Sequence, residues 1–368
     1  MATPSRASEP RAYRPTWAWT PEGLVHQPVV AVDGDGFLVP HRGEPVEDRA
    51  GLLLPGLINA HTHLELGPVA FPPQPGLLPW VGMMRAGTAA TAAHAGANAL
   101  AAIKAGTAAL GEISNTGQST PVLRAANLPG RPWFEVFGID DPTVPPGDVT
   151  PHAPHTTHPG VIQAAAARGE PWSIHFDEDP EEANFLHQKG AWLPFMARLG
   201  RDLSGFVFPH TSPARYLAAL GVLSPRALLV HATQTRGQDL DVIAESGARV
   251  CVCVRSNQAI TGNLPDVSGL RARGIPLSIG TDSLASTPDL DLIAEGVALR
   301  RAFPEVPLDA WLQALTEGGA DALDLPLGRL RPGTAPGLLL VELTGDDPLD
   351  ALFSGTPWRR RWLSCPVV

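Results

Sequence analysis

Residues 52–63 read LLLPGLINAHTH, an apolar run that ends with His61 and His63. A short apolar run entered through Pro-Gly predicts a strand that is buried on both faces. Side chains two positions apart share a face of a strand, so both imidazoles are able to reach one metal ion. A metal site is therefore one interpretation of this pattern. The alternative is a polar strand end that is capped by water.

Three other apolar runs end in the same way. They are residues 171–178 (PWSIHFDE, with His175 and Glu178), 227–232 (ALLVHA, with His231) and 276–282 (PLSIGTD, with Asp282). Taken singly, a hydrogen-bonded core histidine or a helix-capping aspartate is also consistent with each run. Three or four nitrogen and oxygen ligands around one cation, with an acid beside it, form a hydrolytic metal centre. We expect these strand ends to meet at such a centre.

Strand and helix patterns alternate along most of the chain. Apolar runs cover residues 52–59, 107–113, 133–138, 148–152, 172–176, 227–232, 249–254 and 276–281, and helical patterns include 97–105, 180–199, 213–220 and 240–246. This alternation predicts an α/β protein with a parallel sheet, and eight units fit a closed (β/α)8 TIM-like barrel better than an open sheet. The run at 148–152 is weak, so seven or nine units remain alternatives.

Both ends of the chain show shorter β patterns. These lie at residues 23–26, 29–32, 36–39, 338–343 and 362–367. Neither group has enough apolar surface to be stable alone. We predict that residues 1–50 and 326–368 combine into one small β-sandwich domain beside a barrel of residues 51–325. The Pro/Gly-rich segment 71–79 predicts a long loop, and the neighbouring Trp80 favours an ordered lid over a substrate.

Composition limits the classes of function. Of the 368 residues, 44% are hydrophobic and 17% are charged, which allows a large core and disfavours disorder. The formal net charge of -10 argues against nucleic acid or an anionic membrane as the main partner. Three cysteines with no framework of pairs, no apolar leader and no membrane-spanning run together favour a cytoplasmic protein that acts on a small molecule.

The motifs together resemble the amidohydrolase superfamily. In chain order they read PGLINAHTHLEL, TPHAPH, SIHFDEDPEEANFL, LLVHA, VCVCVRSN and SIGTDSLAS, and the likeness runs from about residue 51 to residue 343. They are most similar to its metal-dependent aminohydrolase (ATZ/TRZ-like) branch, which includes deaminases of nucleosides and nucleobases. The chain departs from that branch at Val254, His155 and Pro336-Gly337, where proline, tyrosine and Ala-Asp are usual. The first two departures lie near the expected substrate face.

This resemblance implies a mononuclear site with one Zn²⁺ (or Fe²⁺) per chain. The implied ligands are His61, His63, His175 and Asp282. Asp282 would accept a proton from the water that the ion activates, His231 would orient that water, and Glu178 would protonate a ring nitrogen before ammonia leaves. Two-metal relatives use a carboxylated lysine near the third or fourth strand. Neither of those runs contains a lysine here, which disfavours a second ion.

Several residues suggest a nucleoside-like substrate. Those expected to contact it are Glu65, Trp80, His152, Arg255 and Asn257. The strings HTHLE, FEVFG, RSN and GTDSLAS resemble aminodeoxyfutalosine deaminases, so 6-amino-6-deoxyfutalosine, an intermediate of menaquinone biosynthesis, is the expected substrate. One alternative is a deaminase that acts on S-adenosylhomocysteine, on methylthioadenosine or on a nucleobase. A second alternative is a non-catalytic scaffold. Structural alternatives are a Glu65–Arg85 ion pair and a core role for Trp80. Homodimers are common in the branch, so a homodimer is an open alternative to a monomer.

Overall fold

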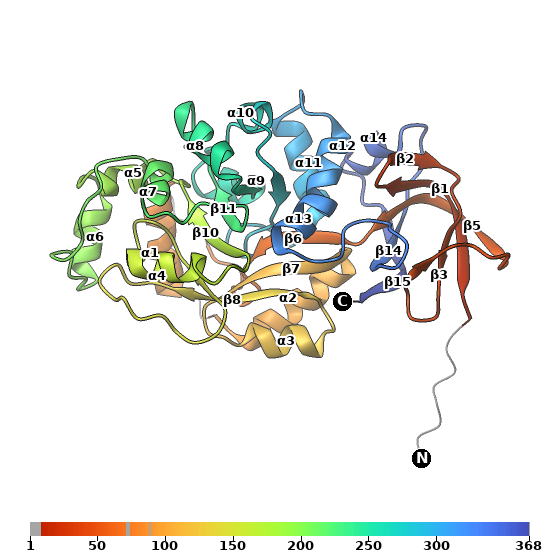
Figure 1. The fold of residues 1–368 in the computed structure, drawn as a ribbon, viewed down its shortest axis with the longest axis horizontal. Coiled ribbons are helices and arrows are strands. Elements are labelled where there is room, and N and C mark those ends of the chain that lie inside the picture. Colours follow the sequence, from red (N-terminus) through yellow and green to blue (C-terminus); the bar gives the residue numbers. More distant parts are fainter. Residues whose placement is uncertain (1–8, 71–73, 88–89, 368) are drawn as a thin grey trace, which may run out of the picture.

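The computed structural model describes residues 9–70, 74–87 and 90–367. A barrel of parallel strands lies beside a small β domain, and the two chain ends both belong to the small domain (Figure 1). The barrel strands are β6 (Leu57–Thr62), β7 (Thr107–Ser114), β8 (Gly130–Val136), β9 (Val149–Pro151), β10 (Trp172–Phe176), β11 (Ala227–His231), β12 (Arg249–Val252) and β13 (Leu277–Ile279).

The eight strands form two parallel halves, β6-β7-β8-β9 and β10-β11-β12-β13. The two halves contact each other at two places. The backbone N–H of His175 donates to the carbonyl of His152 (2.9 Å) between β10 and β9, and a parallel bridge links Thr62 to Asp282 between β6 and the end of β13. These contacts close the barrel. The predicted (β/α)8 fold is therefore confirmed, including its weak fourth strand.

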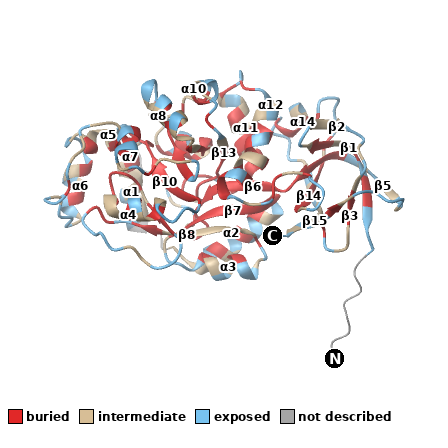
Figure 2. Ribbon diagram, viewed as in Figure 1, coloured by how far each residue is buried: buried red, intermediate tan, exposed pale blue. Residues whose placement is uncertain are grey.

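Helices cover the outside of the barrel, and the barrel strands are buried along most of their length, except for the partly exposed first half of β8 (Figure 2). The helices are α1 (Leu77–Gly87), α2 (Ala92–Lys104), α3 (Ser119–Ala125), α4 (Pro159–Ala166), α5 (Pro180–Leu186), α6 (Trp192–Arg198), α7 (Pro213–Ala219), α8 (Gln238–Ser246), α9 (Val254–Ile260), α10 (Val267–Ala272), α11 (Leu292–Ala302), α12 (Leu308–Gln313), α13 (Gly319–Leu323) and α14 (Pro348–Leu352), with a π-helical turn at Ala314–Gly318. Among the described helices, none is long and apolar enough to span a bilayer.

One predicted helix is two helices in the structure. The pattern at 180–199 divides into α5 and α6, and residues 187–191 connect them. Gln188 and Gly190 in this connection have positive φ angles of 58° and 82°. Such a backbone does not continue a right-handed helix, so the chain turns here.

The small domain is one seven-stranded sheet in the order β15-β14-β5-β1-β3-β4, with β2 paired to β1. Its strands are β1 (Arg11–Thr20), β2 (Gly23–His26), β3 (Val30–Val32), β4 (Leu38–Val39), β5 (Val46–Pro55), β14 (Ala335–Glu342) and β15 (Arg359–Val367). Strand β14 pairs with β5, which joins the two ends of the chain as predicted. Strand β1 was not predicted.

The apolar run that begins at residue 52 belongs to both domains. β5 ends at Pro55 and β6 begins at Leu57, so a division after residue 50 would cut β5. Between them, a Cβ on Gly56 would lie 2.3 Å from the Cβ of Ala108 and 2.9 Å from the carbonyl of Pro336. Only glycine lets the chain pass at this position.

Candidate metal centre and active site

Three histidines converge at the C-terminal ends of β6 and β10. Ring nitrogens of His61, His63 and His175 all lie within 4.8 Å of one another, and the Nε2 atoms of His63 and His175 are 3.2 Å apart. His61 is fully buried, and neither of its ring nitrogens has a hydrogen-bond partner in the described structure. Buried polar atoms without partners are costly unless a ligand satisfies them. Neutral imidazoles in this arrangement fit a zinc-type metal ion.

Burial keeps these imidazoles in the form that binds a metal. It lowers the pKa of His61 well below its usual value, and it lowers the pKa of His63 and of His175 to about 4. All three rings are therefore neutral at neutral pH, with lone pairs free to bind a cation.

Asp282 lies beside this cluster, directly after β13. Its Oδ1 is 3.8 Å from Nε2 of His63, while its Oδ2 accepts hydrogen bonds from Ser256 (2.5 Å) and Ser286 (3.0 Å). The two serines hold one carboxylate oxygen and leave the other toward the histidines. The hydroxyl of Thr62 also donates to the carbonyl of Asp282 (2.8 Å), at a residue whose φ is +57°.

Glu135 lies beside His175, on the side of its Nδ1 atom. The Nδ1 of His175 lies 3.0 Å from the carbonyl of His152 and 3.4 Å from Oε1 of Glu135. Burial raises the pKa of Glu135 to about 8, and Asn115 donates to its Oε2 (2.5 Å). Glu135 was not among the predicted site residues. The available signal was an acidic residue inside an otherwise apolar run at 133–138.

Glu178 and His231 face each other across the site. Oε2 of Glu178 is 3.7 Å from Nε2 of His231, and the amide of Asn257 donates to the Nδ1 of His231 (2.9 Å). That hydrogen bond leaves the proton of neutral His231 on Nε2, toward Glu178. Burial, followed by the charges of Asp282 and Glu182, raises the pKa of Glu178 well above its usual value. Glu178 is therefore a protonated acid that is able to donate a proton.

Glu182 holds the loop that carries Glu178. Its carboxylate accepts from the backbone N–H of Asp177 (3.0 Å) and of Glu178 (2.8 Å), while the hydroxyl of Thr233 donates to the Glu178 carbonyl (2.7 Å). The Nδ1 of His155 lies 3.6 Å from the same carboxylate. Glu182 was not among the predicted site residues. The structure makes it a support for the acid.

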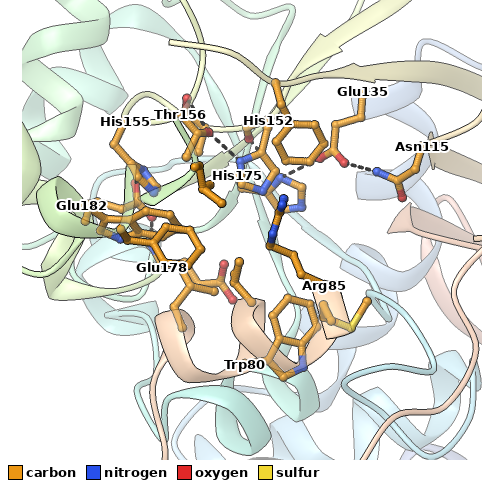
Figure 3. A pocket seen from close by; sticks show the side chains of 18 of the residues that line it. Trp80, Arg85, Asn115, Glu135, His152, His155, Thr156, His175, Glu178 and Glu182 are labelled. Carbon is orange, nitrogen blue, oxygen red and sulfur yellow. Dashed lines mark hydrogen bonds and ion pairs between the residues drawn. The ribbon is translucent and has the colours of Figure 1, made fainter. Parts of the chain in front are cut away.

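Residues of the metal-type centre, together with Glu178 and His231, border a cavity of about 510 Å³ (Figure 3). His63, His175, Glu178, His231 and Asp282 all line it. Apolar side chains from α1 and α6 line other parts, and they include Leu77, Trp80, Val81, Met84, Trp192, Phe195 and Met196. The cavity thus combines a polar metal-type centre with apolar walls, as binding sites for small molecules commonly do.

The structure places two of the five expected substrate contacts in this cavity. Trp80 and His152 line it, and the Trp80 Nε1 donates to the carbonyl of Ala285 (3.3 Å). The predicted lid falls partly outside the described residues, because 71–73 are not described. The last residues of that segment, 77–79, begin helix α1.

The other three expected contacts have different roles in the structure. Glu65 is fully buried, and its carboxylate accepts from Ser114, Ser119 and four backbone N–H groups of residues 115–119, so it holds the loop after β7. Arg255 pairs with Glu295 (2.6 Å) and Asp289 (2.8 Å). Asn257 orients His231, as described above. None of the three lines the cavity, because each is already used by protein groups.

A family model described as "Amidohydrolase family" matches residues 135–360. Together with the barrel and the strand-end cluster, this shows that the chain belongs to the amidohydrolase family. The protein is a hydrolase that acts on C–N bonds.

Two curated relatives illustrate the likeness. The chain is 29% identical over 314 residues to an aminodeoxyfutalosine deaminase of Deinococcus radiodurans, which covers 74% of each protein. It is 29% identical over 346 residues to a 5-methylthioadenosine/S-adenosylhomocysteine deaminase of Nitratidesulfovibrio vulgaris, which covers 80% of this chain and 72% of the relative.

Solved structures show the same fold at lower identity. Aminofutalosine deaminase of Helicobacter pylori superposes with a TM-score of 0.82 at 20% identity, over 98% of this chain and 100% of that one. An adenosine deaminase of Xanthomonas campestris with bound zinc gives a TM-score of 0.72 at 21% identity, over 93% of this chain and 88% of that one.

Proposed function

We propose that this protein is a mononuclear metal-dependent deaminase of an adenine-type nucleoside, and that 6-amino-6-deoxyfutalosine is its substrate. The observation that carries the proposal is Glu178, a buried carboxyl with a raised pKa that lines the same cavity as His63 and His175 of the histidine cluster. In that cluster neither ring nitrogen of His61 has a hydrogen-bond partner in the described structure. Deamination needs such an acid, because a ring nitrogen must be protonated and ammonia must leave.

The ion would be Zn²⁺ or Fe²⁺, held by His61, His63, His175 and Asp282. When bound, it supplies Lewis acidity that brings the pKa of a water toward neutrality. The serines on Oδ2 of Asp282 and the backbone carbonyl on Nδ1 of His175 support this assignment, since groups behind the ligands orient them.

The protein's own groups would move the protons. Asp282 takes a proton from the attacking water through its free Oδ1, and the Nε2–H of His231 orients that water. Glu178 donates its proton to the ring nitrogen beside the carbon under attack. Asp282 then passes the proton it took from the water to the amino group, which leaves as ammonia. The ionised Glu178 takes the proton of the new hydroxyl as the carbonyl forms, so both carboxyls return to their starting states.

The substrate assignment rests on the relatives and on the cavity walls. The named relatives are deaminases of adenine-type nucleosides. Trp80 and Phe137 on the cavity wall suit a planar aromatic group. A methylthioadenosine or S-adenosylhomocysteine deaminase is the second candidate, because the second relative carries that name at the same identity. A non-catalytic scaffold is disfavoured, since it has no use for a fully buried His61 whose ring nitrogens lack hydrogen-bond partners in the described structure.

Ammonia release from purified, zinc-loaded protein tests the proposal. We expect turnover of aminodeoxyfutalosine to exceed that of S-adenosylhomocysteine, methylthioadenosine, adenosine, guanine and cytosine. Metal analysis of the same sample should give about one ion per chain. Protein that carries no zinc or iron and releases no ammonia from any of these compounds would overturn the enzyme proposal. Preferential turnover of methylthioadenosine would establish the second candidate.

A further inference from the structure

Helix α1 presents one face to the cavity. The residues of α1 that line the cavity are Leu77, Trp80, Val81, Met84 and Arg85. Their spacing is that of neighbouring turns on a single helix face. Arg85 therefore lies on the same face as Trp80, and its side chain extends from the helix into the cavity (Figure 3).

Arg85 is a cation for which the described residues provide no partner. Arg85 and Arg201 are the two permanently charged cations among the described residues that line the cavity. Arg201 pairs with Asp140 (3.2 Å), whereas Arg85 makes no hydrogen bond or ion pair within the described parts of the chain. Its five N–H donors remain available to a ligand.

The position of Arg85 in its helix does not account for this orientation. A basic residue in the last turn favours the helix dipole wherever its side chain points. Arg124 holds the equivalent place in α3 and is exposed, as Arg85 is, but it does not line this cavity. Arg124 therefore serves as a matched control.

The surroundings favour a carboxylate over a phosphate. A guanidinium binds a carboxylate through two parallel hydrogen bonds. A dianionic phosphate usually takes several donors or a helix N-terminus, and the described lining of the cavity offers one arginine without an ion-pair partner. Asp282 and Glu182 also line the cavity and would repel a second negative charge.

We propose that Arg85 anchors a carboxylate on the part of the substrate that is not deaminated. The substrate would then be an acidic nucleoside. Aminodeoxyfutalosine and S-adenosylhomocysteine carry a carboxylate at neutral pH, whereas methylthioadenosine and 5'-deoxyadenosine do not. This inference rests on the proposed deaminase function and narrows its substrate class. Met84 and Trp80, on the same helix face, would cover the apolar group next to the carboxylate.

The test compares substrates that differ in the charged group. kcat/KM is measured for aminodeoxyfutalosine against its methyl ester, and for S-adenosylhomocysteine against methylthioadenosine. In the Arg85→Gln variant, we expect the ratio of acid to neutral substrate to fall about 10- to 100-fold in at least one pair. Arg124→Gln should leave both ratios unchanged. The pair whose ratio falls in the Arg85→Gln variant identifies the acidic substrate that Arg85 binds.

Two results would overturn the proposal. One is an equal loss on acid and neutral substrates, which indicates a role for Arg85 in folding or in binding the nucleoside itself. The other is an unchanged ratio in both pairs. Metal content and the melting temperature of each variant exclude a general effect on the fold.

A binding measurement separates this proposal from the deaminase proposal. Calorimetric titration of the Glu178→Gln variant with each acid and its neutral partner reports affinity without turnover. Loss of the preference for the acid in Glu178→Gln/Arg85→Gln supports the carboxylate site even if the wild-type protein releases no ammonia. Equal affinity for acid and neutral ligands in the presence of Arg85 overturns it.

Discussion

At the scale of single residues, the chemistry of the site comes from side chains whose surroundings change their protonation. Glu178 is an ordinary glutamate in sequence, but it is buried among other carboxyls, and its pKa is well above the usual value. His231 lies 3.7 Å away and is neutral, because burial lowers its pKa. An uncharged acid beside a neutral imidazole is suited to proton transfer at neutral pH.

Substitution of Glu178 tests this role. Glu178→Gln keeps the size of the side chain but removes its transferable proton, so we expect kcat to fall about 10²- to 10⁴-fold. KM and metal content should change little, since Glu178 is not an expected ligand. The matched control is Glu181→Gln, whose carboxylate binds Asn184 and Ala191 away from the cavity. Full ammonia release by Glu178→Gln would rule out the mechanism.

The pH dependence of the unfolding free energy tests the raised pKa of Glu135. Its pKa is about 8 in the folded protein and near 4.5 in the unfolded chain. Between these values the folded state binds more protons, so Glu135 makes the protein less stable as the pH rises. Glu135→Gln mimics the protonated form and lacks this dependence. Relative to Glu135→Gln, we expect the unfolding free energy of the metal-free wild type to fall by up to about 1.4 kcal/mol per pH unit.

Urea denaturation of both metal-free proteins at pH 5, 6.5 and 8 measures this difference. A difference that is constant across the three pH values would contradict a raised pKa for Glu135. Metal-free protein is used because a nearby cation would itself lower that pKa.

At the scale of elements, the ends of the barrel strands carry an unusual backbone. Asp177 after β10, His231 at the end of β11 and Asp282 after β13 have φ angles of +50°, +81° and +57°. Residues other than glycine rarely adopt this conformation, and surrounding contacts must hold it. At Asp177 the contact is with the carboxylate of Glu182, which accepts from the Asp177 N–H. At Asp282 it is with the hydroxyl of Thr62, which donates to the Asp282 carbonyl.

The loop after β10 leads to a double-mutant prediction. Glu182→Gln replaces one of the two carboxylate oxygens that accept from the backbone N–H groups of Asp177 and Glu178, so we expect kcat to fall about tenfold with little change in KM. In a Glu178→Gln background, the same substitution should add less than about a twofold loss, because it acts through Glu178. Steady-state kinetics of the two single variants and the double variant measure this coupling.

Glu181→Gln again serves as the control, because Glu181 neighbours Glu182 on the same helix but does not hold the loop. Independent losses that multiply in the double variant would show that Glu182 acts on another part of the site. A large fall in melting temperature for Glu182→Gln alone would indicate a purely structural role.

At the scale of the whole molecule, the small domain is joined to the barrel by β15. The Nε1 of Trp362 donates to the carbonyl of Ile103 (2.9 Å) at the end of α2. The guanidinium of Arg360 donates to the carbonyl of Ala105 (2.9 Å) and to Asp291 (2.8 Å). Figure 1 shows β14 and β15 lying between the barrel and the rest of the small domain.

Trp362→Ala tests this junction. It removes a ring that packs against two hydrophobic clusters, one of which contains residues of the barrel and of β5 and β14. We therefore expect the unfolding free energy to fall by about 3 kcal/mol with no change in metal content. Arg359→Ala, an exposed neighbour on β15 whose side chain is 76% accessible, should change stability by less than about 0.5 kcal/mol. Equal stabilities for the two variants in chemical denaturation would contradict this role of Trp362.

Much of the fold could be predicted because burial leaves a regular pattern in sequence. Buried parallel strands read as apolar runs, and a polar residue at the end of such a run is conspicuous, as at His175 and Asp282. The passage from β5 to β6 at Gly56 leaves no mark in the hydropathy pattern, because residues 52–55 before it and 57–58 after it are all apolar. Strand β1 was missed because its buried and exposed positions do not alternate strictly, and Arg14 and Thr16 interrupt its apolar residues.

The expected substrate contacts show where sequence is insufficient. Glu65 follows His63 by two residues, yet its side chain turns away to hold the loop after β7. Arg255 is occupied by Glu295, which is 40 residues away in the chain. Conversely, Glu182 and Arg85 carried no distinctive motif. The role of a polar side chain depends on partners from other elements, which local sequence does not reveal.

The sequence by itself determined the barrel, the union of the chain ends, and which polar residues end its strands, because each follows from local patterns of burial. Only the tertiary structure decided which residues face one another and which protonation state each of them takes. Glu178 is protonated and His61 is neutral because segments far apart in the chain remove water from both. The reason is physical: strand patterns are encoded locally, whereas desolvation and pairing require the complete fold.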